Sequence, residues 1–250
     1  MLVGSFDDFS RIMYNALKSE FDVVAVIEET NESAQKFINR RIKKLGWFTV
    51  MGQIAFMLLN KQIQKKQCQD RIEAIKQENN LDDRQYDPNI FQHVESVNSE
   101  TTIEKLRQID PDVVVVNGTR IISSKVLKSI SAPFINTHTG ITPKYRGVHG
   151  GYWALTQRDF DNCGVTVHLV DPGVDTGMIL YQDTIQVSDR DNFNTYPYLQ
   201  YAAAIPMMKQ AVRDALNSQL QPKTNDLPSK QWYHPTIFEY LKYRKLYGVN

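Results

Sequence analysis

The sequence is poor in cysteine, because only Cys68 and Cys163 occur among its 250 residues. Two cysteines make no disulfide framework, and the histidines are not spaced to complete a four-ligand zinc site. An excess of one charge is also missing, since 29 Lys and Arg stand against 28 Asp and Glu. A dedicated nucleic-acid-binding protein normally carries a basic excess. We therefore expect reduced thiols, a cytoplasmic location and no nucleic-acid partner.

A run of apolar residues as long as a membrane-spanning helix normally needs is lacking as well, so a true span is the last of the alternatives for residues 45–60. Residues 45–60 (LGWFTVMGQIAFMLLN) carry no charge over 16 positions, whereas a spanning helix needs roughly 20 apolar residues. The N-terminus has neither the basic nor the apolar region of a signal peptide. We expect 45–60 to be a core helix and expect no membrane partner. An interfacial or dimer-contact helix stays open as the alternative, and so does a homodimer.

What the chain does contain is a series of short apolar runs rich in β-branched residues, DVVAVIE at 22–28, DVVVVN at 112–117 and PFINTH at 133–138. Such runs, bounded by polar residues, are typical of strands buried on both faces. Helical patterns lie between them, at 7–20, about 31–80, 99–109 (with Ser99 as a cap) and 122–130. This alternation predicts an α/β fold with a mostly parallel sheet covered on both faces.

The pattern changes in the second half of the chain. Two strand-like runs at 164–170 and 178–187 enclose the turn residues 171–173 (DPG), and so short a connection predicts antiparallel pairing and a mixed sheet. Residues 192–217 are expected to form a helix interrupted near Pro197 and Pro206. A loop at 219–230 and a short aromatic-rich helix within 232–247 follow. We predict a catalytic domain at 1–190, with a helical insertion at about 31–80, and a helical extension at 191–250.

Polar residues gather where the strand at 133–138 ends. Asn136 and His138 are two residues apart, so on an extended strand their side chains point to the same side. At the carboxyl end of an α/β strand, an amide and an imidazole can bind a developing oxyanion. The alternative is that both bond nearby backbone groups. Asp175, in the connection between the last two strands, can orient such a histidine or serve only as a turn residue.

Taken together, INTH at 135–138, PKYRG at 143–147 and GVTVHLVDPGVDTGMIL at 164–180 closely resemble the formyltransferases that use 10-formyltetrahydrofolate. The clear match covers about 112–187. The resemblance implies a Rossmann-like formyltransferase fold, with Asn136, His138 and Asp175 as the catalytic residues. It implies that an amine attacks the formyl carbon. Asn136 and a protonated His138 then donate to the oxygen, and Asp175 relays the amine proton.

The resemblance also implies where the folate donor binds. Its pocket is expected to consist largely of backbone in two loops, and no metal is required. The first loop contains Gly118, Thr119, Arg120, Ile121 and Ile122, and the second contains Val170, Asp171 and Gly173.

The amine acceptor is argued mainly by elimination. Gly4-Ser5 is followed by Asp7 and Asp8, which argue against a phosphate cradle after the first, shortened strand. The residues after 187 are expected to be too few for the RNA-binding domain of tRNA formyltransferases. The chain most resembles the nucleotide-linked amino-sugar N-formyltransferases. A glycinamide ribonucleotide formyltransferase and a non-catalytic folate- or nucleotide-binding module remain the alternatives.

Four further residues are candidates for contacting the acceptor: Lys144, Tyr145, Arg146 and His149. They follow Asn136 and His138 in one loop, where binding residues are common. They equally fit a purely loop-shaping role. His168, which alternates with apolar neighbours on a strand, is expected to be a packing residue.

Overall fold

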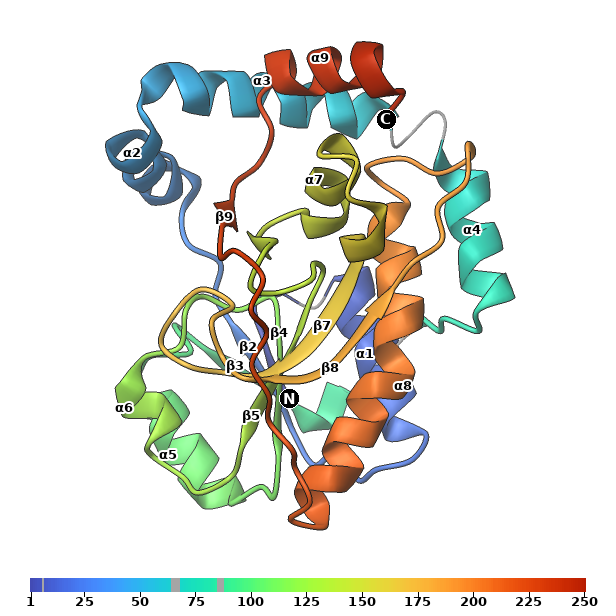
Figure 1. Cartoon of the computed structure of the whole chain (residues 1–250). Coiled ribbons are helices and arrows are strands. Elements are labelled where there is room, and N and C mark those ends of the chain that lie inside the picture. Colours follow the sequence, from blue (N-terminus) through green and yellow to red (C-terminus); the bar gives the residue numbers. More distant parts are fainter. Residues whose placement is uncertain (6, 64–67, 85–87) are drawn as a thin grey trace.

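The protein is built on a mixed sheet, seen in a computed structural model that describes residues 1–5, 7–63, 68–84 and 88–250. Within that part of the chain the sheet has seven strands in the order β3-β2-β1-β4-β5-β7-β8 (Figure 1). Their bounds are β1 Leu2–Val3, β2 Val26–Glu29, β3 Phe91–Val94, β4 Val114–Asn117, β5 Phe134–His138, β7 Gly164–Leu169 and β8 Ile179–Thr184. The strands from β3 to β5 are parallel, and β7 is antiparallel to both β5 and β8. The predicted mixed, mostly parallel sheet is confirmed.

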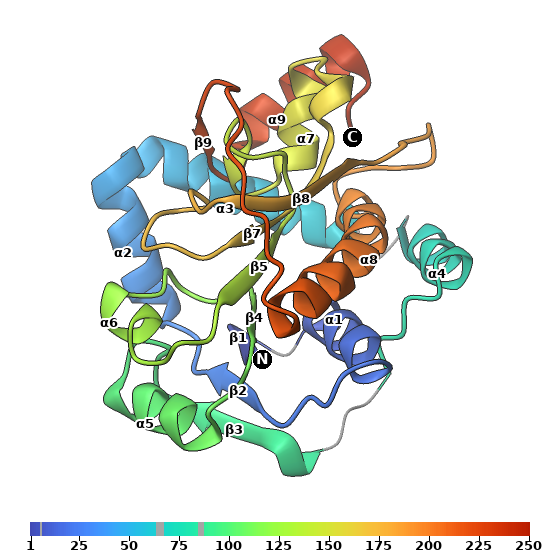
Figure 2. The ribbon, with the colours of Figure 1, turned by 60° about the horizontal axis from the view of Figure 1, so that its bottom comes forward.

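Helices cover both faces of this sheet (Figures 1 and 2). On one side lie α1 (Asp8–Lys18) and α8 (Tyr196–Leu216), and on the other lie α5 (Glu100–Ile109) and the single turn α6 (Ser124–Leu127). Side chains alternate between the two cores, since Val115 and Ile135 pack with α1 and α8 while Val116 and Phe134 pack with α5. This period of two is the reason for the uninterrupted apolar strands.

A further layer of helices lies beyond one end of the sheet (Figure 1). Its members are α2 (Ala34–Leu45), α3 (Trp47–Ile63), α7 (Gly150–Thr156) and α9 (Ile237–Tyr247). Gly46, with φ +81°, makes the turn between α2 and α3. The two-stranded pair of β6 (Arg146–Gly147) and β9 (Gln231–Trp232) connects this layer to the body. Single 3₁₀ turns occupy Pro88–Ile90 and Phe160–Asn162.

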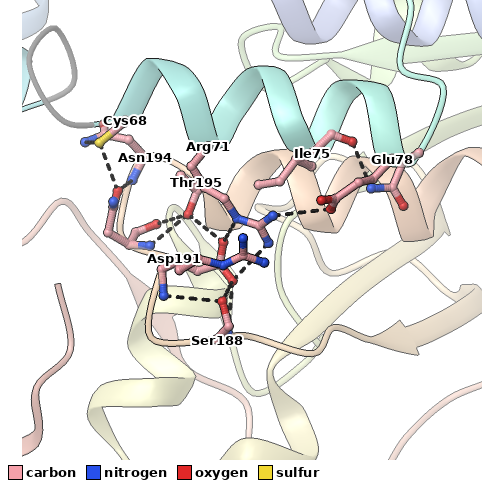
Figure 3. Close-up of polar contacts among 11 residues, drawn as sticks. Cys68, Arg71, Ile75, Glu78, Ser188, Asp191, Asn194 and Thr195 are labelled. Carbon is pink, nitrogen blue, oxygen red and sulfur yellow. Dashed lines mark hydrogen bonds and ion pairs between the residues drawn. The ribbon is translucent and has the colours of Figure 1, made fainter.

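The helix α4 (Gln69–Glu78) is tied to the segment before α8 by a buried ion pair (Figure 3). Arg71 donates from Nε to Oδ1 of Asp191 at 2.8 Å and from Nη2 to Oδ2 at 3.3 Å. The Asp191 side chain is 0% exposed, and Ser188 donates to it from its N–H and its hydroxyl. Burial raises the pKa of Asp191, but Arg71 and Ser188 outweigh that effect and lower it overall.

Several predicted elements differ from those observed. The strand β3 was not anticipated, and the helix expected at 122–130 is confined to α6. The interruption expected at Pro206 is wrong, because α8 continues through it. Pro206 lies on the exposed side of α8, where water can satisfy the carbonyl that loses its partner. The division of the chain at residue 190 stays a prediction.

The uncharged segment at 45–60 fits the core-helix prediction on one side only. Val50 and Phe56 of α3 are buried, but Phe48 is 77% exposed and Leu58 is 65% exposed. Among the described residues, no helix is long and apolar enough to cross a bilayer.

Candidate active site

A cavity of about 390 Å³ opens at the carboxyl ends of β4 and β5. This is where ligands bind in open α/β sheets, and the volume is in the range of small-molecule sites. Asn136, His138 and Asp175 all line it. Every residue predicted to contact folate lines it as well: Gly118, Thr119, Arg120, Ile121, Ile122, Val170, Asp171 and Gly173. A larger cavity of about 570 Å³ at the amino ends of the strands contains none of these residues.

Asn136 is oriented by His168, its partner across the β5–β7 pairing. His168 Nδ1 lies 2.7 Å from the Leu169 carbonyl oxygen, which can only accept, so Nδ1 carries the proton. Nε2 lies 3.2 Å from Asn136 Nδ2, and it can accept from that amide when it carries no proton. The second Nδ2 hydrogen of Asn136 is left for a ligand. His168 is buried, as a packing residue would be, but it also belongs to the site.

Both ring nitrogens of His138 have partners. Nε2 donates to the carbonyl oxygen of Tyr145 at 2.7 Å, and Nδ1 lies 3.4 Å from Oδ2 of Asp175. Since a carbonyl cannot donate, the Nε2 proton is fixed and only Nδ1 can gain or lose one. The structure therefore restricts the anticipated donor role of His138 to the Nδ1 edge that it shares with Asp175.

Asp175 is held in place by β6 and by the two histidines. Its φ of +49° is in the left-handed region, and its Oδ2 accepts the N–H of Gly147 at 2.9 Å. Its Oδ1 lies 3.7 Å from His168 Nε2. Burial alone raises the pKa of Asp175, but the adjacent imidazoles and the Gly147 N–H hold it well below its ordinary value. Asp175 is thus an ionised carboxylate facing His138.

The first folate loop is positioned by Glu29, which the sequence reasoning missed. Glu29 is buried at the carboxyl end of β2 and accepts the N–H of Arg120 at 2.7 Å and that of Val97 at 3.2 Å. Arg120 Nε also lies 3.3 Å from this carboxylate. An acidic residue that ends a buried strand was the available signal, since a buried carboxylate needs donors.

The four predicted acceptor contacts are occupied by internal interactions. Lys144 Nζ and the Tyr145 hydroxyl both reach Asp159, at 2.6 and 2.7 Å. Arg146 donates to the Val174 carbonyl at 2.8 Å and so supports the loop that contains Asp175. None of the four is among the described residues that line the cavity. Their direct contact with an acceptor stays a prediction.

His149, the last of these four, forms a buried pair with a residue of the C-terminal segment. Its Nε2 lies 2.8 Å from Nδ1 of His234, and its ring packs on Phe193. Burial lowers the pKa of His149 well below the ordinary value and lowers that of His234 to about 4, with nearby Arg41 adding to both effects. The pair is therefore neutral near pH 7.

The N-terminus of α1 already holds a carboxylate. Asp7 caps the helix, with Oδ1 accepting the N–H of Ser10 at 3.0 Å, and Asp8 pairs with Arg11. Anions bind at helix N-termini through these same N–H groups. The side chain of Asp7 thus takes the place that a phosphate would need.

The sheet is Rossmann-like, and it brings an amide, an imidazole and a carboxylate together in one cavity of small-molecule size. This is the arrangement of an α/β protein that can carry out chemistry on a polar group. A family model described as formyl transferase matches residues 2–198. The chain belongs to the formyl transferase family, as the sequence motifs predicted.

Known proteins resemble the chain in two ways. The methionyl-tRNA formyltransferase of Thermodesulfovibrio yellowstonii is 35% identical over 102 residues, which cover 40% of this chain and 33% of that protein. The match thus spans about a third of that relative's length. A sugar N-formyltransferase structure from a Shewanella species has a TM-score of 0.57 at 15% identity, covering 92% of this chain and 74% of that one. An N-formyltransferase from Helicobacter canadensis, in complex with folinic acid and dTDP-3-aminofucose, has a TM-score of 0.53 at 17% identity, covering 92% and 69%. These two structures share the fold.

Proposed function

We propose that this protein transfers a formyl group from 10-formyltetrahydrofolate to a primary amine, and that the amine belongs to a nucleotide-linked amino sugar. One observation carries the proposal: Asn136, His138 and Asp175 line the same cavity as both predicted folate loops. Family membership supports the same chemistry.

The cavity fits a folate donor, which supplies the formyl group when bound. Residues 118–122 line the cavity, and the apolar residue Val170 lines it as well. The hydroxyl oxygen of Thr137, another lining residue, is buried without a hydrogen-bond partner in the described part of the chain. A ligand with polar edges and an apolar ring face would satisfy both features.

The three catalytic candidates can divide the work. Asn136 directs one amide N–H at the position of the formyl oxygen, where negative charge develops, and such a donor typically contributes about 3 kcal/mol. His138 Nδ1 can take the proton that the attacking amine loses and return it to the folate nitrogen as its bond to the formyl carbon breaks. The ionised Asp175 stabilises the resulting imidazolium. A non-catalytic module would not need this arrangement.

Fewer observations bear on the identity of the amine acceptor than on the formyl transfer. Asp7 at the N-terminus of α1 disfavours a monophosphate at that position, and so disfavours glycinamide ribonucleotide. Two proteins that share the fold act on sugars or were crystallised with a nucleotide sugar. Relatives by sequence are named for methionyl-tRNA, so a charged tRNA belongs among the acceptors tested. A cytoplasmic location and a homodimer stay predictions.

The test incubates the protein and 10-formyltetrahydrofolate with a panel of amines, read by mass spectrometry. The panel contains nucleotide-linked amino sugars, glycinamide ribonucleotide and methionyl-tRNA, and the Asn136→Ala variant serves as the inactive control. A gain of one formyl group on an amino sugar alone is the expected result. Formylation of glycinamide ribonucleotide or tRNA alone would overturn the acceptor. No product on any amine, despite donor binding, would favour the binding module.

A further inference from the structure

The outward face of α3 exposes large apolar side chains. Phe56 and Val50 point into the body and are buried. On the opposite side of the same helix, Trp47, Phe48, Met51 and Leu58 are all at least half exposed. Their spacing of one, three and seven residues places them along one side of a helix.

The neighbouring helix α9 extends this apolar surface. It packs beside α3, since the rings of Phe56 and Tyr240 have centroids 5.0 Å apart (Figure 1). With Tyr240 directed inward, Phe238 is 77% exposed and Leu241 is about half exposed. We name the exposed apolar residues of both helices the cap face; they are Trp47, Phe48, Met51, Leu58, Phe238 and Leu241. Large exposed apolar side chains that gather on neighbouring helices are typical of interaction sites.

The helices around the cap face are strongly basic. Together α2, α3 and α9 hold nine of the chain's 29 Lys and Arg but only one of its 28 Asp and Glu. That one acid, Glu239, is bonded into the capping box of α9. Positive charge is therefore concentrated at this end of a molecule whose net charge is only +1.

We propose that the cap face docks on an anionic lipid surface. Aromatic and aliphatic side chains beside Lys and Arg are the composition by which helices bind in the plane of a membrane interface. The basic residues attract anionic headgroups, and the apolar ones enter the headgroup boundary. This inference goes beyond the proposed function and does not depend on it. It develops the interfacial alternative for the segment at 45–60, against the expectation of no membrane partner.

Other occupants fit the cap face less well. A two-fold contact between copies of the chain would bring two basic surfaces together, which opposes association. A nucleic acid would match the charge, but its contacts are mostly polar and would leave Phe48, Leu58 and Phe238 unused. The helix α2 has no buried residue, so it stands out from the body, as a surface anchor can.

The experiment measures sedimentation of the full chain with phosphatidylcholine vesicles and with vesicles in which about a third of the lipid is phosphatidylglycerol. Binding to the anionic vesicles only, weakened by salt, is the expected result. Phe48→Ser with Leu58→Ser should lower the partition coefficient at least tenfold, because each removes a side chain worth about tenfold. Lys43→Gln with Lys242→Gln should lower it several-fold.

Matched controls lie elsewhere on the surface. Leu216→Ser changes a half-exposed leucine at the end of α8, and Lys128→Gln changes an exposed lysine after α6. Both should leave partition unchanged. Equal binding to neutral vesicles, no binding to anionic ones, or insensitivity to the cap-face variants would overturn the proposal. So would a dimer that Leu58→Ser dissociates, or an RNA that competes with the vesicles.

Discussion

The cavity at the end of the sheet and the cap face treat polar and apolar groups in opposite ways. In the cavity, buried polar side chains are bonded to one another, as Asn136 is to His168 and His138 to Asp175. On the cap face, apolar side chains such as Phe48 lie in water. The bonded polar side chains of the cavity fix the geometry that catalysis needs. The exposed apolar side chains of the cap face gain free energy when another surface covers them.

The two regions also differ in how they are attached. The cavity is built on strands in the middle of the sheet, between two cores. The helical layer packs around a separate core that contains Phe56, Trp153 and Tyr240, with the buried pair of His149 and His234 beside it. Changes in the cavity should therefore alter turnover, and changes in the helical layer should alter the free energy of unfolding.

The largest effect is expected for Asp175→Asn. The variant keeps the shape of the side chain but removes the charge that stabilises the His138 imidazolium, so kcat should fall by about 10³. Donor affinity, measured by calorimetry, should change little. Asp171→Asn in the same loop is the control and should change donor affinity more than kcat. Equal losses of affinity and turnover in Asp175→Asn would make it a binding residue.

Next in size is the effect of Asp191→Ala on folding. It leaves the buried Arg71 with only the exposed Glu78 as a carboxylate partner, and breaking such a buried pair costs about 3–5 kcal/mol. Urea unfolding followed by circular dichroism measures the free energy of unfolding. Asp82→Ala removes an exposed partner of Arg84 and should cost less than about 1 kcal/mol. Similar costs for both would mean that the Arg71–Asp191 pair does not fasten α4 to the segment before α8.

A smaller effect is expected from pH. The pKa of His234 is lowered from 6.5 to about 4, so the unfolded chain binds the proton more readily. The free energy of unfolding therefore has its full value above pH 6.5 and decreases as the pH falls toward 4. At pH 5 the decrease due to His234 is about 2 kcal/mol. His234→Asn should weaken this dependence of the unfolding free energy and leave the part that His149 contributes.

The smallest effect is expected for Thr236→Ala at the start of α9. Its hydroxyl accepts the N–H of Glu239, and losing such a cap costs about 1 kcal/mol. Ser99→Ala removes the corresponding cap of α5 in the body and should cost about as much. Thermal unfolding compares the two. A cost several times larger for Thr236 would show that α9 supports more of the helical layer than its own first turn.

Local patterns predicted most of the central fold. The apolar runs at 112–117 and 133–138 gave β4 and β5, and Ser99 caps α5 as expected. The strand β3 was missed because FQHV lacks the β-branched apolar run that identified the others. The helix α8 passes through Pro206 because tertiary packing of Ala204 and Met208 outweighs a lost exposed hydrogen bond.

The candidate site was predictable where a motif was continuous in the chain, and less so where it was not. The sequence motifs predicted that Asn136, His138 and both loops lie at one site, and all of them line the cavity. His168 required the antiparallel register that places it opposite Asn136. Glu29 required knowledge that β2 and the loop after β4 meet at one edge, a contact between residues 91 positions apart in the sequence.

The two buried thiols lie in separate cores. Cys68 packs in the core of α1 and α8, where its sulfur bonds to Asn192, and Cys163 packs in the core under α7 with its pKa raised by burial to about 12. A thiol reagent can modify either one only when the surrounding structure opens. Labelling kinetics at Cys68 would report opening of the core with α1 and α8, and those at Cys163 would report opening of the core of the helical layer. The native chain thus contains its own reporter for each of these two cores.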